Sequence, residues 1–369
     1  MNYDYSSPFS ILPFILLLRE MAGACDLLRV GAVVANRALQ RSLRTSHYSP
    51  SIPASSINQE PFQYSEHSSV IILIMMFASI AFILPILAAS ATGFERCGTK
   101  SPTPEHIRQA QHIQYHEAVA RTQRDSLVEG TVSSIDINVY YHVIRFSQYD
   151  DSVDLSALHS QTNILNDAYR PHGIAWHLRG AAEVDASAWP VTKDLKTLEE
   201  WAEPMQRLLR KGTYADLNVY ILSASRLDDV LGSAKFPEDI PIGVRNTTAQ
   251  SKFDVDGVIV GSHTLPDVGK YPFDLGKTLV HETGHWLDLF HTFEGGCDGS
   301  GDGIDDTPTE AGPHYGACFV SSDTCDGDGE DAIANYMNYS YDSCLREFTL
   351  GQEVRMHGAW KRLRAPHQA

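Results

Sequence analysis

Basic residues are scarce in this chain of 369 residues. It has 29 Lys and Arg against 46 Asp and Glu, which gives a formal net charge of −17. A protein that binds nucleic acid through the phosphates needs a basic surface, so the composition argues against a nucleic-acid partner. Tandem repeats and long biased tracts are also lacking, which excludes collagen, coiled coils and wholesale disorder. With 43% hydrophobic residues, most of the chain has the composition of a globular protein.

Cysteine is uncommon as well, and its 6 residues are too few for a fold held together mainly by disulfides. Four of them gather in one late segment rich in Gly and Asp: Cys297, Cys318, Cys325 and Cys344. Disulfides persist in oxidising compartments, so this clustering predicts cross-linked loops in an extracellular protein. Four cysteines allow three pairings, and their spacing alone does not choose among them.

The first 91 residues differ from the rest of the chain. They carry five acidic and five basic residues, so the acidic excess lies entirely after them. Within them, residues 70–89 read VIILIMMFASIAFILPILAA, an uncharged run long enough to span a bilayer. One interpretation of this run is a membrane-spanning signal anchor.

The same run also fits a cleaved secretion signal. Translation from Met75 or Met76 would place an apolar stretch before the small residues Ala89, Ser90 and Ala91, which fit a signal-peptidase site. We favour this interpretation, with a signal peptide over residues 75–91 and a non-native or disordered extension over residues 1–74. It predicts secretion without stable membrane association.

Beyond residue 91, strand and helix patterns alternate. Strands are predicted at residues 135–146, 174–178, 217–222 and 257–260, and helices at residues 101–124, 156–169 and 195–210. Interleaved strands and helices, followed by an irregular Gly-rich end, predict an α+β domain with a one-sided sheet. In the first helix, His112 and His116 are spaced to share a metal, but no carboxylate or third ligand lies nearby, which favours a solvated helix face.

The residues that point to chemistry lie at 275–291, LGKTLVHETGHWLDLFH. His281 and His285 are four residues apart on a helix, so their rings project from one face toward a single ion. Glu282 can take a proton from a metal-activated water and hand it to a leaving amine. His291 completes a three-ligand zinc site that keeps an open position for water.

Other interpretations of this segment stay open at this point. A downstream carboxylate, Glu294 or Glu310, is the alternative third ligand of a different zinc hydrolase. The three histidines could also be ordinary core or surface residues. A secreted binding protein with a structural or vestigial metal site is a further alternative.

The spacing H-E-x-x-H-x-x-G-x-x-H is the metzincin zinc signature, which a Met-turn follows. NYMNYSYD at residues 335–342 supplies Met337 in the expected place. The chain resembles the pappalysin branch of the metzincins, especially its fungal secreted members. The resemblance is carried by the segment HETGHWLDLFHTFEGGCDGSGDGIDDTP, by the loop bracketed by cysteines and by NYMNYSYDSC. The similarity runs from Arg96-Cys97-Gly98 through LNVYIL and LGSAKFP to FTLGQ near Gly351.

The resemblance implies an α+β metzincin-like fold. A twisted mixed sheet and an active-site helix would form the upper part, and an irregular C-terminal subdomain would carry the Met-turn. It also implies a zinc-dependent endopeptidase with one catalytic Zn²⁺ that cleaves proteins or peptides. We accordingly assign residues 92–130 to a pro-region and residues 131–369 to the catalytic domain.

The resemblance assigns roles to individual residues. His281, His285 and His291 would bind zinc, and Glu282 would be the general base. Met337 would form a hydrophobic floor beneath the metal. The resemblance also implies two disulfides, Cys297 with Cys325 and Cys318 with Cys344.

Two further residues receive roles as hypotheses. The phenol of Tyr339 would stabilise the oxyanion, or else be a half-buried tyrosine with a satisfied hydroxyl. Cys97 is left over once Cys25 is removed with the leader and the other four cysteines pair. We hypothesise that it blocks the open zinc position in a zymogen, and an incidental free thiol is the alternative.

One position departs from the signature, because Asp288 replaces its glycine. Glycine allows a positive φ where the helix ends and the chain turns to deliver the third His. Asp tolerates that conformation at a cost of about 1 kcal/mol, so an active site survives in one interpretation. A catalytically weak or inactive metal-binding homologue is the alternative.

Three smaller expectations concern the remaining polar motifs. Residues 295–308, GGCDGSGDGIDDTP, have the carboxylate density of a Ca²⁺ loop, although they do not match the EF-hand register. Asn246 begins a usable glycosylation sequon, whereas that of Asn338 falls in the predicted floor of the site. Asp342 either attracts basic substrate side chains in the S1′ pocket or faces solvent.

Overall fold

The computed structural model describes residues 95–125, 134–147, 153–189, 198–223, 227, 230–243, 247–269, 271–299, 301–318, 321–327 and 329–368. The predicted extension, the signal peptide or anchor, and Asn246 lie outside the described residues. Within those ranges no helix combines the length and apolar character that crossing a membrane requires.

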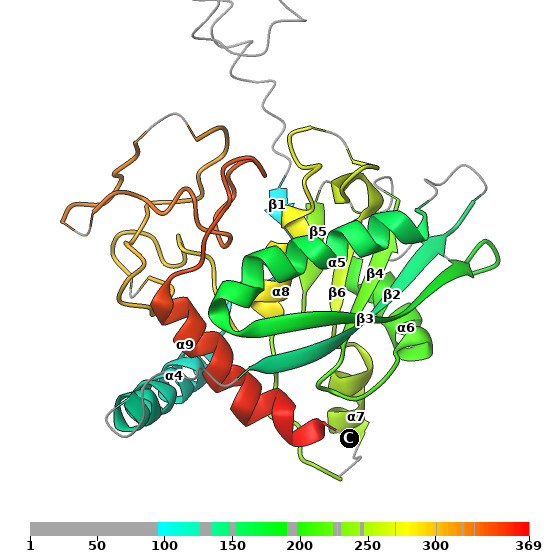
Figure 1. Cartoon of the computed structure of the whole chain (residues 1–369), viewed down its shortest axis with the longest axis horizontal. Coiled ribbons are helices and arrows are strands. Elements are labelled where there is room, and N and C mark those ends of the chain that lie inside the picture. The colour runs from blue at the N-terminus through cyan, green and yellow to red at the C-terminus, as the bar shows by residue number, and fades with distance from the viewer. Residues whose placement is uncertain are drawn as a thin grey trace, which may run out of the picture. The chain divides into compact units, whose positions relative to one another are not determined.

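A mixed six-stranded sheet forms the centre of the unit that spans residues 87–369 (Figure 1). Its strands are β1 (Glu95–Cys97), β2 (Ile135–Arg145), β3 (Ile174–Asp185), β4 (Leu217–Leu222), β5 (Val230–Ala234) and β6 (Val258–Gly261), in the order β1-β5-β6-β4-β2-β3. Strand β5 runs antiparallel to β6, and the other pairings are parallel. The predicted mixed sheet is confirmed, and β1, which lies in the predicted pro-region, forms one edge of the sheet, where Cys97 pairs with Gly232.

The α-helices among the described residues are α4 (Pro104–Asp125), α5 (Leu155–Tyr169), α6 (Leu198–Leu209), α7 (Thr247–Asp254), α8 (Lys277–Trp286) and α9 (Leu350–Ala359). The strands and helices predicted before residue 222 are present, although β3 extends to Asp185, well past the predicted end. Strands β1 and β5 and helices α7 and α9 were not predicted.

The prediction of a one-sided sheet is wrong. In β4, Val219 and Ile221 face one core with α5 and α8, whereas Tyr220 and Leu222 face a second core that contains Met205 of α6. Side chains alternate between the two faces of a strand, so both faces of the sheet are covered. The unbroken burial of β4 is typical of a central parallel strand rather than of a half-exposed one.

Helix α4 has the solvated face that its sequence predicts, and its other face is buried. Ala110 and Ile113 are buried, and Gly358 of α9 allows close packing, because a Cβ there would lie 2.9 Å from Cγ2 of Ile113. His112 and His116 remain exposed on the outer face, with their Nε2 atoms 3.1 Å apart. The helix thus docks on the catalytic domain along one face.

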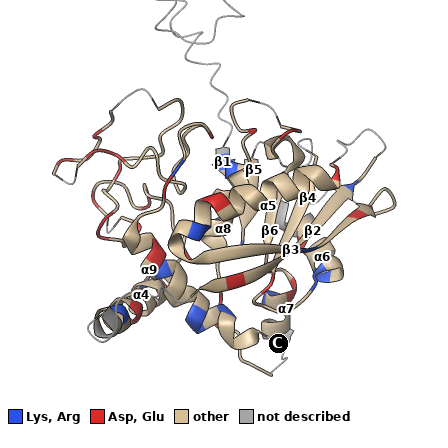
Figure 2. Cartoon of the chain, in the orientation of Figure 1, with Lys and Arg blue, Asp and Glu red and all other residues tan. Residues whose placement is uncertain are grey.

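Charged pairs surround this apolar contact between α4 and α9, both of which carry residues of both signs (Figure 2). The ammonium of Lys361 lies 2.7 Å from Glu117, and the guanidinium of Arg121 lies 2.6 Å from Glu353. Helix α4 is therefore held by long-range contacts that no local sequence pattern reveals.

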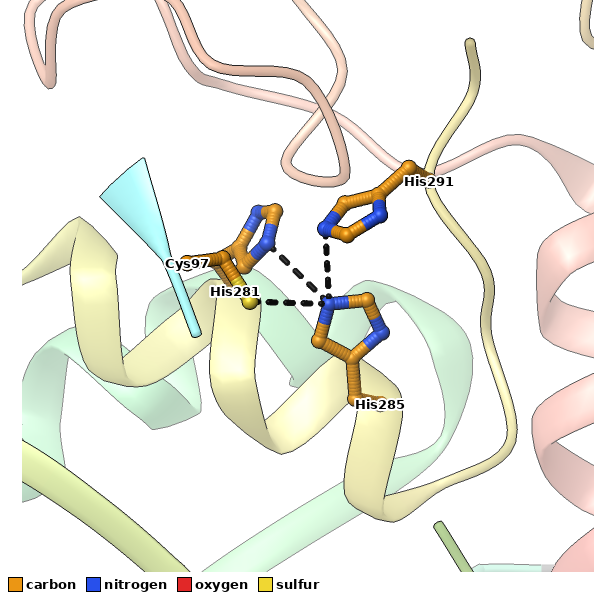
Figure 3. A group of neighbouring side chains, drawn as sticks. All are labelled: Cys97, His281, His285 and His291. Atoms are coloured by element: carbon orange, nitrogen blue, oxygen red, sulfur yellow. Dashed lines mark hydrogen bonds between the residues drawn. The ribbon is translucent and has the colours of Figure 1, made fainter. Parts of the chain in front are cut away.

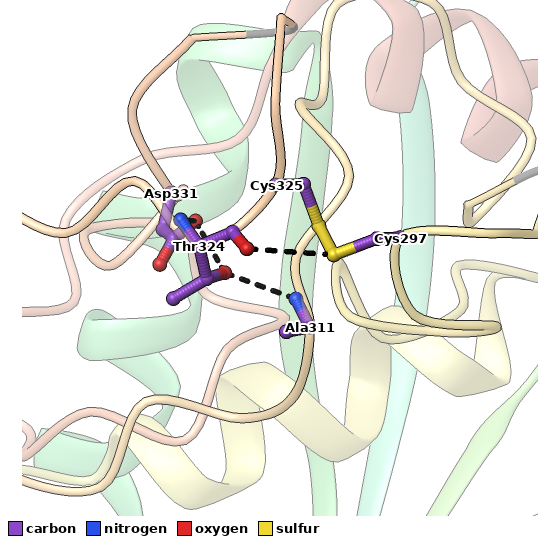
Figure 4. The surroundings of a disulfide bond; sticks show 5 residues. All are labelled: Cys297, Ala311, Thr324, Cys325 and Asp331. Carbon is purple, nitrogen blue, oxygen red and sulfur yellow. Dashed lines mark hydrogen bonds between the residues drawn. A yellow bond between two sulfur atoms is a disulfide. The ribbon is translucent and has the colours of Figure 1, made fainter.

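Between α8 and α9 the chain is largely irregular, as predicted, and two disulfides cross-link it. They join Cys297 to Cys325 and Cys318 to Cys344, the pairing that the resemblance implies. Beside the first disulfide, Oγ1 of Thr324 accepts a hydrogen bond from the backbone of Ala311 and donates one to Asp331 (Figure 4).

Candidate metal centre

Helix α8 supplies three of the predicted site residues. It begins after Gly276, whose φ of 71° is a left-handed conformation that glycine adopts without strain. His281, Glu282 and His285 follow on the helix, and all three are fully buried. Burying polar groups without partners is costly, so the contacts of these side chains identify what holds them in place.

The end of α8 delivers the third histidine. Asp288 adopts a φ of 75°, as predicted for the position of the signature glycine. The backbone N–H of Leu289 donates to the carbonyl of Gly284, and that of Asp288 donates to the carbonyl of His285, each at 2.9 Å. These two bonds form a Schellman motif, which satisfies the last helical carbonyls and turns the chain toward His291.

Arg364 also holds the C-terminal end of α8. Arg364 lies with its guanidinium carbon 3.4 Å from the ring centroid of Trp286, and its Nε donates to the Trp286 carbonyl at 3.0 Å. The same guanidinium pairs with the buried carboxylate of Asp256. The C-terminal segment thereby fixes the helix turn that carries His285.

Backbone carbonyls orient two of the histidine rings. Nδ1 of His281 lies 2.7 Å from the carbonyl of Tyr336, and Nδ1 of His285 lies 2.7 Å from the carbonyl of Leu289. A carbonyl only accepts, so each Nδ1 carries the proton and each Nε2 presents a lone pair. This second contact is the usual support of a metal-binding histidine.

The Nε2 atoms of the three histidines converge with one sulfur atom (Figure 3). Nε2 of His285 lies 3.2 Å from that of His281, 3.1 Å from that of His291 and 3.5 Å from Sγ of Cys97. All four ligand atoms lie within 4.8 Å of one another, and among the described residues no other group of three or more His, Cys, Asp or Glu side chains is arranged this way. Imidazole nitrogen and thiolate sulfur are the donors that zinc prefers, so this group fits the ion.

Burial dominates the electrostatics of the cluster. It holds the pKa values of His281 and His285 well below the usual imidazole value, and the neighbouring imidazoles add to the effect. Burial also raises the pKa of Glu282 to about 8, and burial together with the Glu282 charge raises the pKa of the Cys97 thiol. The rings of His281 and His285 are therefore neutral at pH 7, the form that binds metals, and a cation would favour the ionised Glu282 carboxylate and Cys97 thiolate.

Cys97 and Thr99 both contact the carboxylate of Glu282. Its Oε2 accepts a hydrogen bond from the hydroxyl of Thr99 at 2.9 Å and one from the Cys97 thiol at 3.4 Å. Oε1 has no hydrogen-bond partner among the residues that the structure describes. The residue predicted as general base thus faces the same space as the four candidate ligands.

Met337 packs against helix α8, and Tyr339 contacts the histidine cluster. A Cβ at Gly284 would lie 2.4 Å from Sδ of Met337, so the sulfur packs directly against the backbone of α8. The hydroxyl of Tyr339 lies 3.2 Å from Nε2 of His291 and donates to the carbonyl of Cys97 at 3.4 Å. Tyr339 therefore contacts both a candidate ligand and the backbone carbonyl of Cys97.

The two alternative carboxylate ligands lie outside the cluster. Oε2 of Glu294 is 3.6 Å from Nδ1 of His291, on the far side of that ring from the shared centre. The carboxylate of Glu310 accepts hydrogen bonds from Asn338 and from the backbone of Ala332.

A buried ion pair next to Cys97 was not predicted. Arg96 donates to Oδ1 of Asp342 at 2.7 Å and to the carbonyl of Ser340 at 2.7 Å, and its guanidinium carbon lies 5.2 Å from the ring centroid of Phe273. Asp342 is 1% exposed and does not face solvent. The pairing joins residues 246 positions apart, and neither it nor the Thr99 contact has a signal in the local sequence.

Comparisons with known proteins agree with this geometry. A model of the family described as Peptidase_M43, pregnancy-associated plasma protein-A, matches residues 213–361. An extracellular metalloprotease of Colletotrichum graminicola is 40% identical over 298 residues, which cover 80% of this chain and 100% of the relative. Extracellular metalloprotease 1 of Coccidioides posadasii is 38% identical over 299 residues, covering 80% of this chain and 98% of the relative.

Solved structures show the same fold. A promirolysin mutant of Tannerella forsythia is 25% identical, with a TM-score of 0.50, and the match covers 73% of this chain and 95% of that one. Mirolysin in complex with compound 9 is also 25% identical, with a TM-score of 0.50 and coverage of 63% and 97%. From these matches and the histidine cluster, the chain belongs to the M43, or pappalysin, family of metzincins and is a zinc metallopeptidase.

Proposed function

We propose that the protein is a secreted zinc endopeptidase that is made as a latent precursor. The observation that carries the proposal is the convergence of His281, His285 and His291 with Cys97 of the pro-region at one buried point next to Glu282. The extracellular names of the relatives, the two disulfides and the predicted signal peptide support secretion.

The three histidines would hold the ion in the active enzyme, and the chain's own groups would perform the proton transfers. When bound there, zinc supplies Lewis-acid activation of a water molecule and of the scissile carbonyl. Glu282 would take a proton from the attacking water and deliver it to the leaving amine. The Tyr339 hydroxyl would donate a hydrogen bond to the oxygen of the attacked carbonyl, as it now does to the carbonyl of Cys97.

Latency would follow from the position of the pro-region. Cys97 would be the fourth ligand in the precursor, and Thr99 would hold the Glu282 carboxylate away from any water. Strand β1 also pairs with β5, the edge strand along which an extended substrate would otherwise lie. Removing residues 92–130 would open the cleft in one step.

The Arg96 pair supports a preference for basic side chains. The backbone N–H groups of Leu275 and Lys277 donate to Oδ2 of Asp342, which fixes this carboxylate whether or not Arg96 is present. Departure of the pro-region would leave a buried carboxylate beside the metal centre. We propose that this S1′ pocket takes Lys or Arg of the substrate.

The conformation of Asp288 supports an active enzyme over the inactive alternative. Its positive φ and the Schellman bonds place His291 in the cluster, so the substitution leaves the ligand geometry intact.

Calcium binding stays a prediction. In residues 295–308, Oδ1 of Asp302 accepts hydrogen bonds from Ile304 and Thr307, and burial raises the pKa of this carboxyl to about 7. Oδ2 has no hydrogen-bond partner among the described residues, so this oxygen could serve as one ligand of an ion. A rise in Tm of the chelator-treated protein on adding CaCl₂ would support the site.

The proposed function is tested by digesting a proteome-derived peptide library with the processed enzyme, with and without a chelator. Cleavage that the chelator abolishes and Zn²⁺ restores supports the endopeptidase. Full zinc occupancy with no turnover of any protein or peptide would overturn it and favour a secreted metal-binding homologue.

A further inference from the structure

The residue that replaces the signature glycine contacts the pro-region helix. Oδ1 of Asp288 lies 2.7 Å from Nε2 of His106, in the first turn of α4. The side chain of Asp288 is 1% exposed and that of His106 is 17% exposed, so solvent screens this pair only weakly. A glycine at position 288 would satisfy the backbone equally well but would offer nothing to His106.

Aromatic rings complete the surroundings of the imidazole. The ring centroid of His106 lies 4.7 Å from that of Phe236 and 5.4 Å from that of Phe290, both in edge-to-face geometry. Phe236 lies two residues after the end of β5, and its ring centroid is 5.3 Å from that of His285. We refer to Asp288, Phe236 and Phe290 as the His106 pocket.

His106 forms a hydrogen bond with the buried carboxylate of Asp288. Oδ2 has no hydrogen-bond partner within the described part of the chain, so His106 supplies the hydrogen bond that this carboxylate makes there. The charge of Arg355 also acts on Asp288, but losing the hydrogen bond to a buried carboxylate is costly, so we expect the docked pro-region to lose stability if either member of the pair is removed.

We propose that the His106 pocket is a docking site for the pro-region and that it holds α4 on the catalytic domain separately from Cys97. The inference rests on the proposed function, because it assumes that the pro-region leaves the active enzyme. His106 follows Cys97 by nine residues, and two anchors on one short segment raise the effective concentration of each at its site. On this account, Asp288 contributes to latency rather than to catalysis.

The test measures how tightly a cut pro-region stays bound. A specific protease site is introduced within residues 126–133 of the full-length precursor, and a fluorescent label is attached to the pro-region. After the chain is cut at this site, the protein is diluted and the fraction of labelled pro-region that stays bound is measured. This fraction gives the dissociation constant without relying on any peptidase activity. The variants are Asp288→Gly, His106→Ala and the double variant, and His112→Ala on the exposed face of α4 is the matched control.

We expect Asp288→Gly and His106→Ala each to raise the dissociation constant at least about tenfold. The double variant should have about the same dissociation constant as the weaker-binding single variant, because both changes remove the same contact. His112→Ala should have no effect. Glycine adopts the φ of 75° freely, so Asp288→Gly should keep its zinc content, and Asp288→Asn, which keeps an acceptor, should be intermediate.

An unchanged dissociation constant in Asp288→Gly would overturn the proposal, and so would additive effects in the double variant. The proposed function fails separately. If the label dissociates as expected but the freed domain cleaves no peptide, the docking site stands and the endopeptidase does not.

Discussion

The sulfur atom of Cys97 lies 3.4 Å from Oε2 of Glu282 and 3.5 Å from Nε2 of His285, so one pro-region residue contacts both the candidate base and a candidate zinc ligand. Replacing this thiol removes the proposed fourth ligand. We expect Cys97→Ser precursor to be at least about tenfold more active than wild-type precursor in a fluorogenic peptide assay, with the zinc content unchanged.

The double variant Cys97→Ser/Glu282→Gln is the control, because it should be inactive and thereby exclude a contaminating peptidase. A Cys97→Ser precursor that is as latent as the wild type would rule the thiol out as the cause of latency.

The contact between Gly284 and Met337 predicts a coupled effect on stability. Alanine favours helix by about 1 kcal/mol over glycine, but a Cβ at position 284 would lie 2.4 Å from the Met337 sulfur. We expect Gly284→Ala to lower the free energy of unfolding by about 1–3 kcal/mol through overpacking. In urea titrations, Gly284→Ala/Met337→Ala should be less destabilised than the sum of the two single variants, and strictly additive losses would show that the residues do not press on each other.

Glu353 predicts a pH-dependent contribution to stability. A hydrogen bond from His172, together with Arg121, lowers its pKa from 4.5 to about 2. The folded chain thus keeps the carboxylate ionised where the unfolded chain protonates it, so the stabilisation is complete above pH 4.5 and is lost as the pH falls from 4.5 toward 2. At pH 7 we expect the free energy of unfolding of the wild type to exceed that of Glu353→Gln by up to about 3 kcal/mol. The difference in Tm between the two proteins should shrink as the pH falls below 4.5. A difference in Tm that grows on acidification would contradict this prediction.

Asp342 predicts a specificity that a single substitution should remove. Asp342→Asn keeps the acceptors for Leu275 and Lys277 but removes the charge that pairs with Arg96. We expect kcat/KM to fall at least about tenfold for peptides with Lys or Arg at P1′ and to change little for peptides with Leu there. Equal losses on both peptide series would indicate a structural role instead.

Short-range patterns explain which parts of this molecule could be predicted from its sequence. The i, i+4 spacing of His281 and His285 placed them on one helix face, and the αL requirement at Asp288 followed from backbone sterics. Helix α9 was missed although its capping box, Thr349 with Gln352, is visible in the sequence. Strand β5 was missed because VLGSA has a weak strand composition and is stabilised by pairing with β6 and β1.

Long-range pairs account for what the sequence could not predict. Arg96 with Asp342 and His106 with Asp288 connect residues 246 and 182 positions apart. Their partners are set by how α4 and β1 dock, which depends on tertiary packing and not on local composition. The contacts of Arg96 and His106 were therefore visible only in the structure, whereas a blocking role for Cys97 was already a hypothesis from the sequence.

The most direct test of the central claim compares Glu282→Gln with wild type in the processed enzyme, by measuring zinc content and kcat/KM on one peptide substrate. Glu282 is not a proposed ligand, so we predict equal zinc, one ion per chain, with a loss of kcat/KM of at least about 100-fold. Equal zinc with retained activity would contradict the assignment of Glu282 as the general base.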